Sequence, residues 1–264
     1  MQPPTDPPPG ASGPPSPESS APPPPEAPPP PPPEPRQRWR LVFSRGRVSS
    51  DQVGRAVIEA WQGALIGCGL ALAQLDATGR PRIAFGAPLP ATAEGVAELA
   101  EIFLAERVPA WRVREALAER LPAGHTLLSA EDVWLGAPPL PGRVTAADWR
   151  VELEPAGVDP VELGVAAERL LASSSLPRTR SKGGSDKPYD LRPLLDDVDV
   201  SQPASAGEPI AVRIRTRFNP ELGSGRPEEV VAALAEAMGS ELVVSRIVRQ
   251  RLLLIEDVPS RTRV

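Results

Sequence analysis

The chain has 264 residues, a net charge of −5, one cysteine (Cys68) and one histidine (His125). One cysteine excludes a disulfide within the chain and the several thiolates that an iron–sulfur cluster needs. One cysteine with one histidine also falls short of a structural zinc site. The acidic run Asp196, Asp197 and Asp199 lacks the glycine-centred spacing of a calcium loop, so we interpret it as a solvated turn and expect no metal site.

Residues 1–35 hold about half of the prolines and contain no basic or aromatic side chain. Such a segment cannot bury enough apolar surface to offset the entropy lost on ordering, so we expect a disordered tail with polyproline II character. Its acidic residues account for most of the net charge, which leaves the rest of the chain near neutral. A near-neutral body neither requires nor excludes a nucleic-acid partner.

The sequence shows neither the basic and apolar regions of a signal peptide nor an apolar run that could span a bilayer. The run over residues 64–75 is interrupted by Gly67, Gly69 and Gln74. We therefore expect a cytoplasmic location.

The first predicted unit covers residues 36–142. It begins with a strand in which Trp39, Leu41 and Phe43 face one side, because alternate residues of a strand point to opposite faces. A helix capped by Ser49 or Ser50 follows. The remaining expected elements are strands over 70–75 and 82–85, a segment near 96–104 whose spacing fits either a helix or a strand, a helix opened by Pro109, and strand pieces at 126–128 and 133–135.

The second predicted unit, residues 143–264, repeats this order. A strand over 149–153 precedes a helix that Asp159 caps and Pro160 opens. The later elements are a strand over 176–180, an alternating strand over 210–218, a helix opened by Pro227, and a long strand over 242–255.

Both units thus give the order strand, helix, strands, helix, strand, which is the order of a ferredoxin-like split β-α-β unit. We predict an α+β protein with two tandem ferredoxin-like units after the disordered tail.

Several short motifs of the body match one bacterial family in the right order. They are Trp39-Arg40-Leu41-Val42-Phe43-Ser44, Arg82-Ile83 with Phe85, Pro88-Leu89-Pro90, Leu121-Pro122-Ala123-Gly124, Asp190-Leu191-Arg192-Pro193 and Arg226-Pro227-Glu228-Glu229-Val230. On these motifs the chain resembles the radical SAM-associated (radical SAM-linked) protein family of bacteria, a domain of unknown function.

The resemblance implies a protein encoded beside, or fused to, a radical S-adenosylmethionine (SAM) protein, with a link to RNA-related metabolism through its genetic neighbours. It implies no cofactor in this chain itself. S-adenosylmethionine and an iron–sulfur cluster would enter only through the partner protein.

Two polar motifs of the family are altered in this chain. Where the family has Ser-His-x-Asp, the sequence reads Ser49-Ser50-Asp51-Gln52, and where it has Asn-Pro-His-Pro, the sequence reads Thr78-Gly79-Arg80-Pro81. The divergence indicates that the family's polar site is largely lost. Arg55, Arg80 and Arg82 remain nearby as candidates for a small anion site.

The strand over 210–218 is the other candidate binding feature. Arg213, Arg215 and Arg217 share one side of it, and an exposed basic sheet face can hold RNA phosphates. The aromatic platform of an RNA-recognition motif is not present in this half, and neighbouring Asp and Glu side chains would neutralise the arginines. His125 and Cys68 have no evident catalytic partner in the sequence, so we interpret both as structural.

These observations rank three functions. The leading expectation is a non-catalytic accessory or interaction protein that works with a radical SAM protein. The alternatives are an RNA or nucleotide modification enzyme with a divergent site around Asp51, Arg55, Arg80 and Arg82, and an RNA-binding module that uses the basic sheet face. The catalytic residues of the enzyme alternative are unknown from sequence.

Overall fold

The computed structural model describes residues 33–76, 78–182, 185–205 and 207–257. The predicted proline-rich tail, residues 1–35, thus lies almost entirely outside the described residues. The elements of the first half are β1 (Gln37–Arg45), the 3₁₀ turn η1 (Ser50–Gln52), α1 (Arg55–Ile66), β2 (Ala84–Phe85), β3 (Glu94–Leu104), α2 (Ala110–Ala118), β4 (His125–Val133) and the 3₁₀ turn η2 (Leu140–Arg143).

The second half carries a similar set. Its elements are β5 (Val144–Leu153), α3 (Pro160–Ala172), β6 (Pro177–Lys182), β7 (Ser185–Asp190), the 3₁₀ turn η3 (Arg192–Leu194), β8 (Leu195–Ser201), β9 (Ile210–Asn219), β10 (Gly223–Ser224), α4 (Pro227–Met238) and β11 (Val244–Leu254). The protein is therefore of the mixed α+β class.

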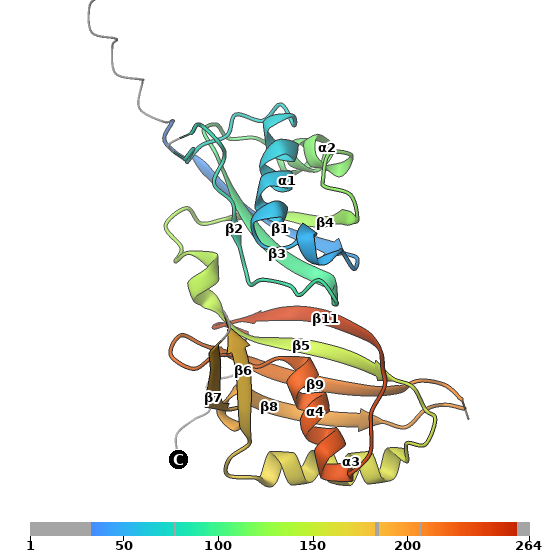
Figure 1. Ribbon diagram of the computed structural model, residues 1–264. Helices are drawn as coiled ribbons and strands as arrows, with labels where there is room; N and C mark the ends of the chain where they lie inside the picture. The colour runs from blue at the N-terminus through green and yellow to red at the C-terminus, as the bar shows by residue number, and fades with distance from the viewer. Residues whose placement is uncertain (1–32, 77, 183–184, 206, 258–264) are drawn as a thin grey trace, which may run out of the picture. The chain divides into compact units, whose positions relative to one another are not determined.

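One mixed sheet of nine strands runs through both halves (Figure 1). Seven strands follow the order β10-β9-β5-β11-β3-β1-β4, with β2 also paired to β3 and β8 also paired to β9. Neighbours are antiparallel except at the junction of the halves, where β11 and β3 run parallel through Val248↔Glu94 and Arg249↔Gly95. Strands β6 and β7 form a separate hairpin.

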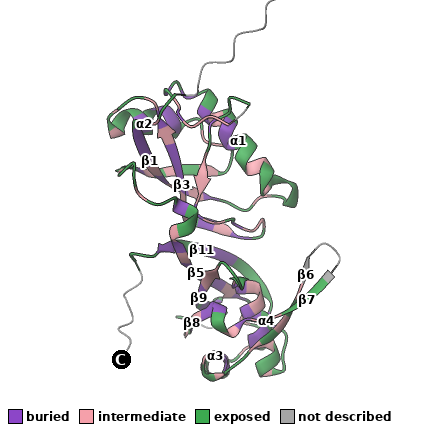
Figure 2. Ribbon diagram, turned by 90° about the vertical axis from the view of Figure 1, so that its left-hand side faces the viewer, coloured by how far each residue is buried: buried purple, intermediate pink, exposed green. Residues whose placement is uncertain are grey.

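The hydrophobic core consists of two clusters, one for each half of the sheet. In the first cluster, Trp61 and Leu65 of α1 pack with Leu41 of β1. In the second, Leu163 of α3 and Leu234 of α4 pack with residues of β5 and β9. Figure 1 shows α1 and α2 beside β1, β3 and β4, with α3 and α4 beside β5 and β9. Figure 2 shows that the buried residues gather where helices and strands meet.

The described helices include none that is long and apolar enough to cross a membrane.

The ambiguous segment near 96–104 is the strand β3. It pairs with β1 from Gln37↔Leu104 to Arg45↔Gly95. Both faces of β3 are covered over part of its length, since Ala100 and Ile102 on one face and Glu101 on the other are fully buried. Burial on both faces removes the alternation by which a half-buried strand is recognised, which explains the ambiguity of the sequence pattern.

Three other expected elements differ in the structure. The acidic run Asp196, Asp197 and Asp199, interpreted from the sequence as a solvated turn, lies in β8, where pairing with β9 makes it part of the sheet. The strand predicted over 70–75 is an irregular segment with two isolated bridges, Leu72↔Leu104 and Leu75↔Pro81. Gln74 has φ of +53°, a left-handed conformation that interrupts pairing. The helix expected from Ser49 or Ser50 begins only at Arg55, because Gly54 (φ +62°) separates it from η1.

The predicted start of α3 is confirmed in detail. Asp159 Oδ1 accepts a hydrogen bond from the Val161 amide at 2.8 Å, and Pro160 occupies the first helical position, where no amide hydrogen is needed.

A buried ion pair joins the two halves at the β3–β11 junction. Arg249 Nε donates to Glu98 Oε1 at 2.8 Å, and the two side chains are 1% and 5% exposed. The remaining guanidinium nitrogens donate to the carbonyl oxygens of Ala87 and Pro88, each at 3.0 Å. The guanidinium also lies over the Trp149 ring, 5.3 Å from its centroid. A Cβ at Gly95 would lie 2.6 Å from Glu98 Cγ, so this close approach requires glycine.

We expect Glu98→Leu to lower the free energy of unfolding by about 3–5 kcal/mol, because Arg249 would remain buried without its carboxylate. Urea unfolding followed by circular dichroism measures the change. Glu59→Ala is the control, since it removes the exposed Arg55–Glu59 pair and should cost at most about 0.5 kcal/mol. The double variant Glu98→Leu/Arg249→Met should recover part of the loss. Equal effects of Glu98→Leu and Glu59→Ala would contradict this account.

Candidate functional site

The apolar face of the first half of the sheet ends in three polar residues beside a pocket of about 360 Å³. Arg45 ends β1, His125 begins β4 as its cross-strand neighbour, and Glu98 of β3 lies opposite Phe43. The apolar walls of the pocket are formed by Phe43, Val57, Ile58, Ile83, Phe85 and Leu89. We call this cavity the Arg45 pocket.

Arg45 is the buried cation of the pocket. It is 5% exposed, and it continues the face of β1 that carries Trp39, Leu41 and Phe43. Its Nη2 donates to the Pro90 carbonyl at 2.6 Å and lies 3.3 Å from the Leu89 carbonyl, while its buried Nε has no hydrogen-bond partner. Burial lowers the pKa of Arg45, and nearby Arg249 lowers it further against the opposing effect of Glu98.

The segment from Ala87 to Ala93 is held by two arginines. Arg249 binds the carbonyls of Ala87 and Pro88, and Arg45 binds those of Leu89, Pro90 and, at 3.5 Å, Ala93. Proline has no amide hydrogen to contribute to a sheet, so Pro88 and Pro90 keep the segment out of the regular strands. The arginine side chains therefore satisfy carbonyl groups that strand pairing leaves free.

His125 contributes a neutral ring to the same pocket. Its ring centroid lies 5.6 Å from that of Phe43 and 5.7 Å from that of Trp61. Burial lowers the pKa of His125, and the charge of Arg45 adds to this, while the hydrogen bond with the Ala123 carbonyl and the charge of Glu98 oppose it. Nδ1 lies 3.2 Å from that carbonyl oxygen, which assigns the proton to Nδ1 and leaves Nε2 as an acceptor without a partner.

The sequence did not single out Arg45 or Glu98 as site residues, and it suggested Arg249 only as a possible part of the basic sheet face. The usable signal was Arg45 itself, a charged residue at the next position of the apolar face set by Trp39, Leu41 and Phe43. His125 was noticed, and the structure places its ring in the pocket. The Pro88-Leu89-Pro90 motif was noticed only as a family marker.

The predicted anion candidates of the first half lie on the surface. Arg55, Arg80 and Arg82 are all exposed, and none is among the described residues that line the Arg45 pocket. Arg55 donates to Glu59 Oε1 at 2.8 Å, one helical turn away. The Arg80 amide donates to Asp76 Oδ1 at 3.0 Å, within a turn that holds the pKa of Asp76 below its usual range through the Thr78 hydroxyl and backbone amides.

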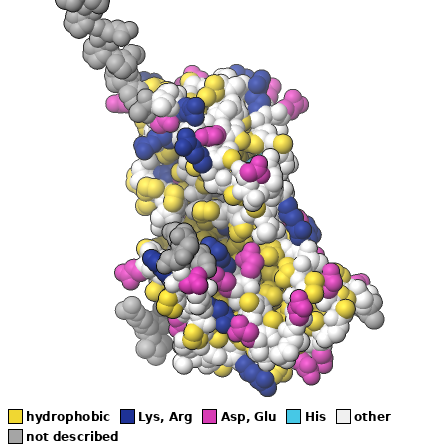
Figure 3. All heavy atoms as spheres, viewed as in Figure 1, with side chains coloured by type: hydrophobic (Ala, Val, Ile, Leu, Met, Phe, Trp, Pro, Cys, Tyr) yellow, Lys and Arg dark blue, Asp and Glu magenta, His cyan; other side chains and the backbone are white. Residues whose placement is uncertain are grey.

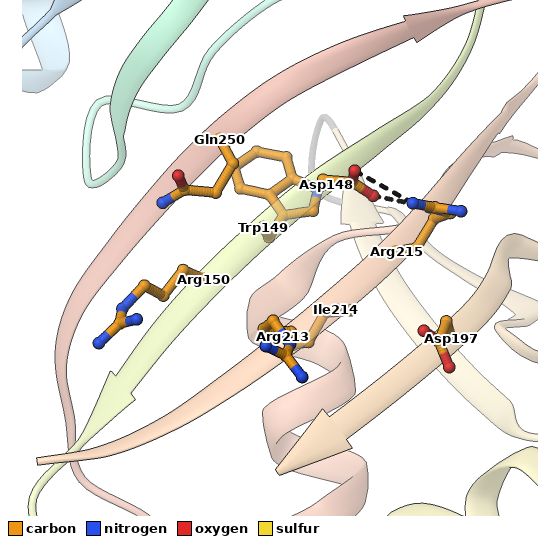
Figure 4. A pocket seen from close by; sticks show the side chains of 8 residues that line it. All are labelled: Asp148, Trp149, Arg150, Asp197, Arg213, Ile214, Arg215 and Gln250. Atoms are coloured by element: carbon orange, nitrogen blue, oxygen red, sulfur yellow. Dashed lines mark hydrogen bonds and ion pairs between the residues drawn. The ribbon is translucent and has the colours of Figure 1, made fainter. Parts of the chain in front are cut away.

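The predicted basic face on β9 is paired with carboxylates. Arg215 donates to both oxygens of Asp148, at 2.6 and 3.1 Å, as Figure 4 shows. Arg217 donates to Asp196 at 2.5 Å, and Arg213 donates to Asp199.

The pocket over this face has a volume of about 340 Å³. Asp148 also accepts from Arg251, at 2.8 Å. Burial by itself would raise the pKa of Asp148, but the hydrogen bonds from Arg215 and Arg251 outweigh it and hold the carboxyl below its usual range. The positive charge available to a phosphate on this face is correspondingly reduced.

We expect nuclear magnetic resonance titration to place the pKa of His125 below its ordinary value of 6.5. The folded state then binds fewer protons than the unfolded state just below that value, so stability should fall as the pH drops from about 7 to about 5. The untagged chain has one histidine, so its ring signal needs no assignment. His125→Phe should remove this part of the pH dependence, whereas a pKa above 6.5 would refute the assignment.

The sequence matches one family model over residues 78–221, described as "Uncharacterized protein conserved in bacteria (DUF2344)". No curated protein matches it. A similar solved structure, entitled "Crystal Structure of a Cbf5-Nop10-Gar1 Complex", has 8% identity and a TM-score of 0.47, and the match covers 81% of this chain and 48% of that one. The match thus spans about half the length of that chain.

The family match confirms the expected domain of unknown function, and its description makes no mention of radical SAM proteins. The matched residues include the Pro88-Leu89-Pro90 motif and both Glu98 and His125 of the pocket. Residues 78–221 make up more than half of the sequence, and the chain therefore belongs to the DUF2344 family of uncharacterized bacterial proteins.

Proposed function

We propose that this chain is a non-catalytic accessory protein, which binds a ligand in the Arg45 pocket and works with a separate radical SAM protein. The binding role rests on two polar groups of the pocket, Arg45 Nε and His125 Nε2, which have no hydrogen-bond partner. These polar groups lie among apolar side chains in a pocket, which is the composition of a recognition site.

The same groups are poorly suited to proton transfer. An arginine stays protonated at any ordinary pH, and the Glu98 carboxylate is already bonded to Arg249. His125 is oriented by a backbone carbonyl rather than by a carboxylate. A general base usually needs a substrate within reach and a partner, such as a carboxylate, that orients it. Within this pocket, ligand binding is therefore favoured over acid-base catalysis.

The radical SAM partner follows from the sequence resemblance. Cys68 is the single cysteine of the chain and is buried, so a cluster with several thiolate ligands would have to belong to the partner. S-adenosylmethionine, which such a cluster activates, would bind there as well.

The RNA-binding alternative is weakened by the charge pairing on β9. The three arginines that would hold phosphates each donate to an aspartate. On the face of the molecule in Figure 3, basic and acidic side chains are interspersed rather than gathered by sign. Such a surface releases few counterions on contact with RNA and gains little affinity from it.

We further interpret the halves as two ferredoxin-like units, 36–142 and 143–264, in keeping with the sequence prediction. Support comes from the strand orders β4-β1-β3-β2 and β11-β5-β9-β8, each of which places the fourth strand beside the first and the third beside the second. The parallel β3–β11 pairing then joins the units into one sheet.

Affinity purification of the tagged full chain from its native host tests the accessory role. We expect a radical SAM protein among the recovered partners, identified by mass spectrometry and by the visible absorbance of its iron–sulfur cluster. Ribonuclease treatment before elution provides the control, because a direct protein contact survives it. Failure to recover any radical SAM protein, with and without crosslinking, would overturn the proposal, and recovery of RNA alone would favour the RNA-binding alternative.

A further inference from the structure

We propose that the Arg45 pocket binds a small aromatic carboxylate, an inference that rests on the binding role proposed above. Three features of the pocket point to this ligand class: an incompletely compensated buried cation, apolar walls with aromatic rings, and an unpartnered acceptor on His125.

The charge balance at the base of the pocket favours an anion. Arg45 and Arg249 lie close enough to influence each other, and Glu98 is the carboxylate that acts on Arg45. Glu98 is hydrogen-bonded to Arg249 through both of its oxygens. Two cations therefore share one anion in a buried setting, and a buried charge is costly unless it is paired. A ligand carboxylate would restore neutrality.

The geometry of Arg45 leaves a donor for that carboxylate. Its Nη2 is anchored on the Leu89 and Pro90 carbonyls, whereas its Nε is buried and has no partner. Nε itself is buried, so a ligand carboxylate reaches it when the Arg45 side chain turns toward the pocket. Hydrogen bonds between a guanidinium and a carboxylate are among the stronger ones in proteins.

The aromatic side chains of the pocket walls favour a ligand that contains an aromatic ring. Phe43 and Phe85 contact each other edge-on, with centroids 6.4 Å apart, and the His125 ring lies beside Phe43. Aromatic rings favour offset or edge-to-face contact with a further ring. The volume of about 360 Å³ lies at the low end of the range for ligand pockets, which fits a molecule with one ring.

His125 adds a second polar contact. His125 lines the pocket, and with its proton on Nδ1 its buried Nε2 is an acceptor without a partner. A ligand hydroxyl or ring N–H can donate to it. The ligand that satisfies both orphan groups is thus an aromatic acid that also carries a hydrogen-bond donor.

Isothermal titration calorimetry of the purified full chain with three probes tests the proposal. The probes are 4-hydroxyphenylacetate, phenylacetate, which lacks the hydroxyl, and 4-hydroxyphenylethanol, which lacks the carboxylate. We expect the first to bind best. The alcohol should bind at least about 10-fold more weakly because it loses a charge-assisted bond, and phenylacetate about 2- to 10-fold more weakly because it loses a neutral one.

Variants of the pocket provide matched comparisons. Ile58→Trp should abolish binding by filling the pocket from a partly exposed position on α1. Ile66→Trp makes the same change at an exposed position of the same helix, outside the lining residues, and should bind as the wild type does. Arg45→Gln should remove the preference for the acid over the alcohol. Circular dichroism spectra establish that each variant is folded.

Absence of binding by 4-hydroxyphenylacetate at millimolar concentration would overturn the proposal, as would equal affinity for the acid and the alcohol. Unchanged binding by Ile58→Trp would place the ligand elsewhere and would overturn it too. These measurements use the isolated chain, so their failure would leave the recovery of a radical SAM partner unaffected, and the two proposals can fail separately.

Discussion

The carboxylate of Glu98 is near two buried arginines and is bonded to one of them. Its pair with Arg249 fastens β11 to β3, where the two halves of the sheet meet through a short parallel ladder. Because the Glu98 carboxylate is bonded to Arg249, Arg45 donates to backbone carbonyls instead, and its Nε has no hydrogen-bond partner. The joining of the halves and the charge of the pocket thus depend on the same side chain.

The segment Ala87–Ala93 contacts both the pocket, through Arg45, and the junction of the halves, through Arg249. Its prolines cannot take part in a full strand ladder, so its carbonyls are bound by Arg45 on one side and Arg249 on the other. Gly86, just before it, packs so closely on Leu252 of β11 that a Cβ there would lie 2.6 Å from Leu252 Cδ1. A motif that serves as a family marker in the sequence is therefore a wall of the pocket and part of the junction.

Local patterns in the sequence predicted local structure well and distant pairings poorly. Three short-range signals correctly predicted their elements. They are the alternation at Trp39–Phe43, the alternation at 210–218 and the cap at Asp159. Glu98 and Arg249 are 151 residues apart, and no periodicity relates them. Arg215 and Asp148 are likewise 67 residues apart. Their pairing reduces the net positive charge of the basic strand, and no local pattern predicts it.

The proposed anion binding depends on Arg45 Nε, a donor without a hydrogen-bond partner. The most direct test is the nuclear magnetic resonance signal of the Arg45 Nε–H group, identified by its loss in Arg45→Lys, during titration with 4-hydroxyphenylacetate. The account predicts a downfield shift of this signal as a hydrogen bond to the carboxylate forms, with the Arg249 signal little changed because Glu98 already holds it. An Arg45 signal that stays in place while the probe binds would contradict it.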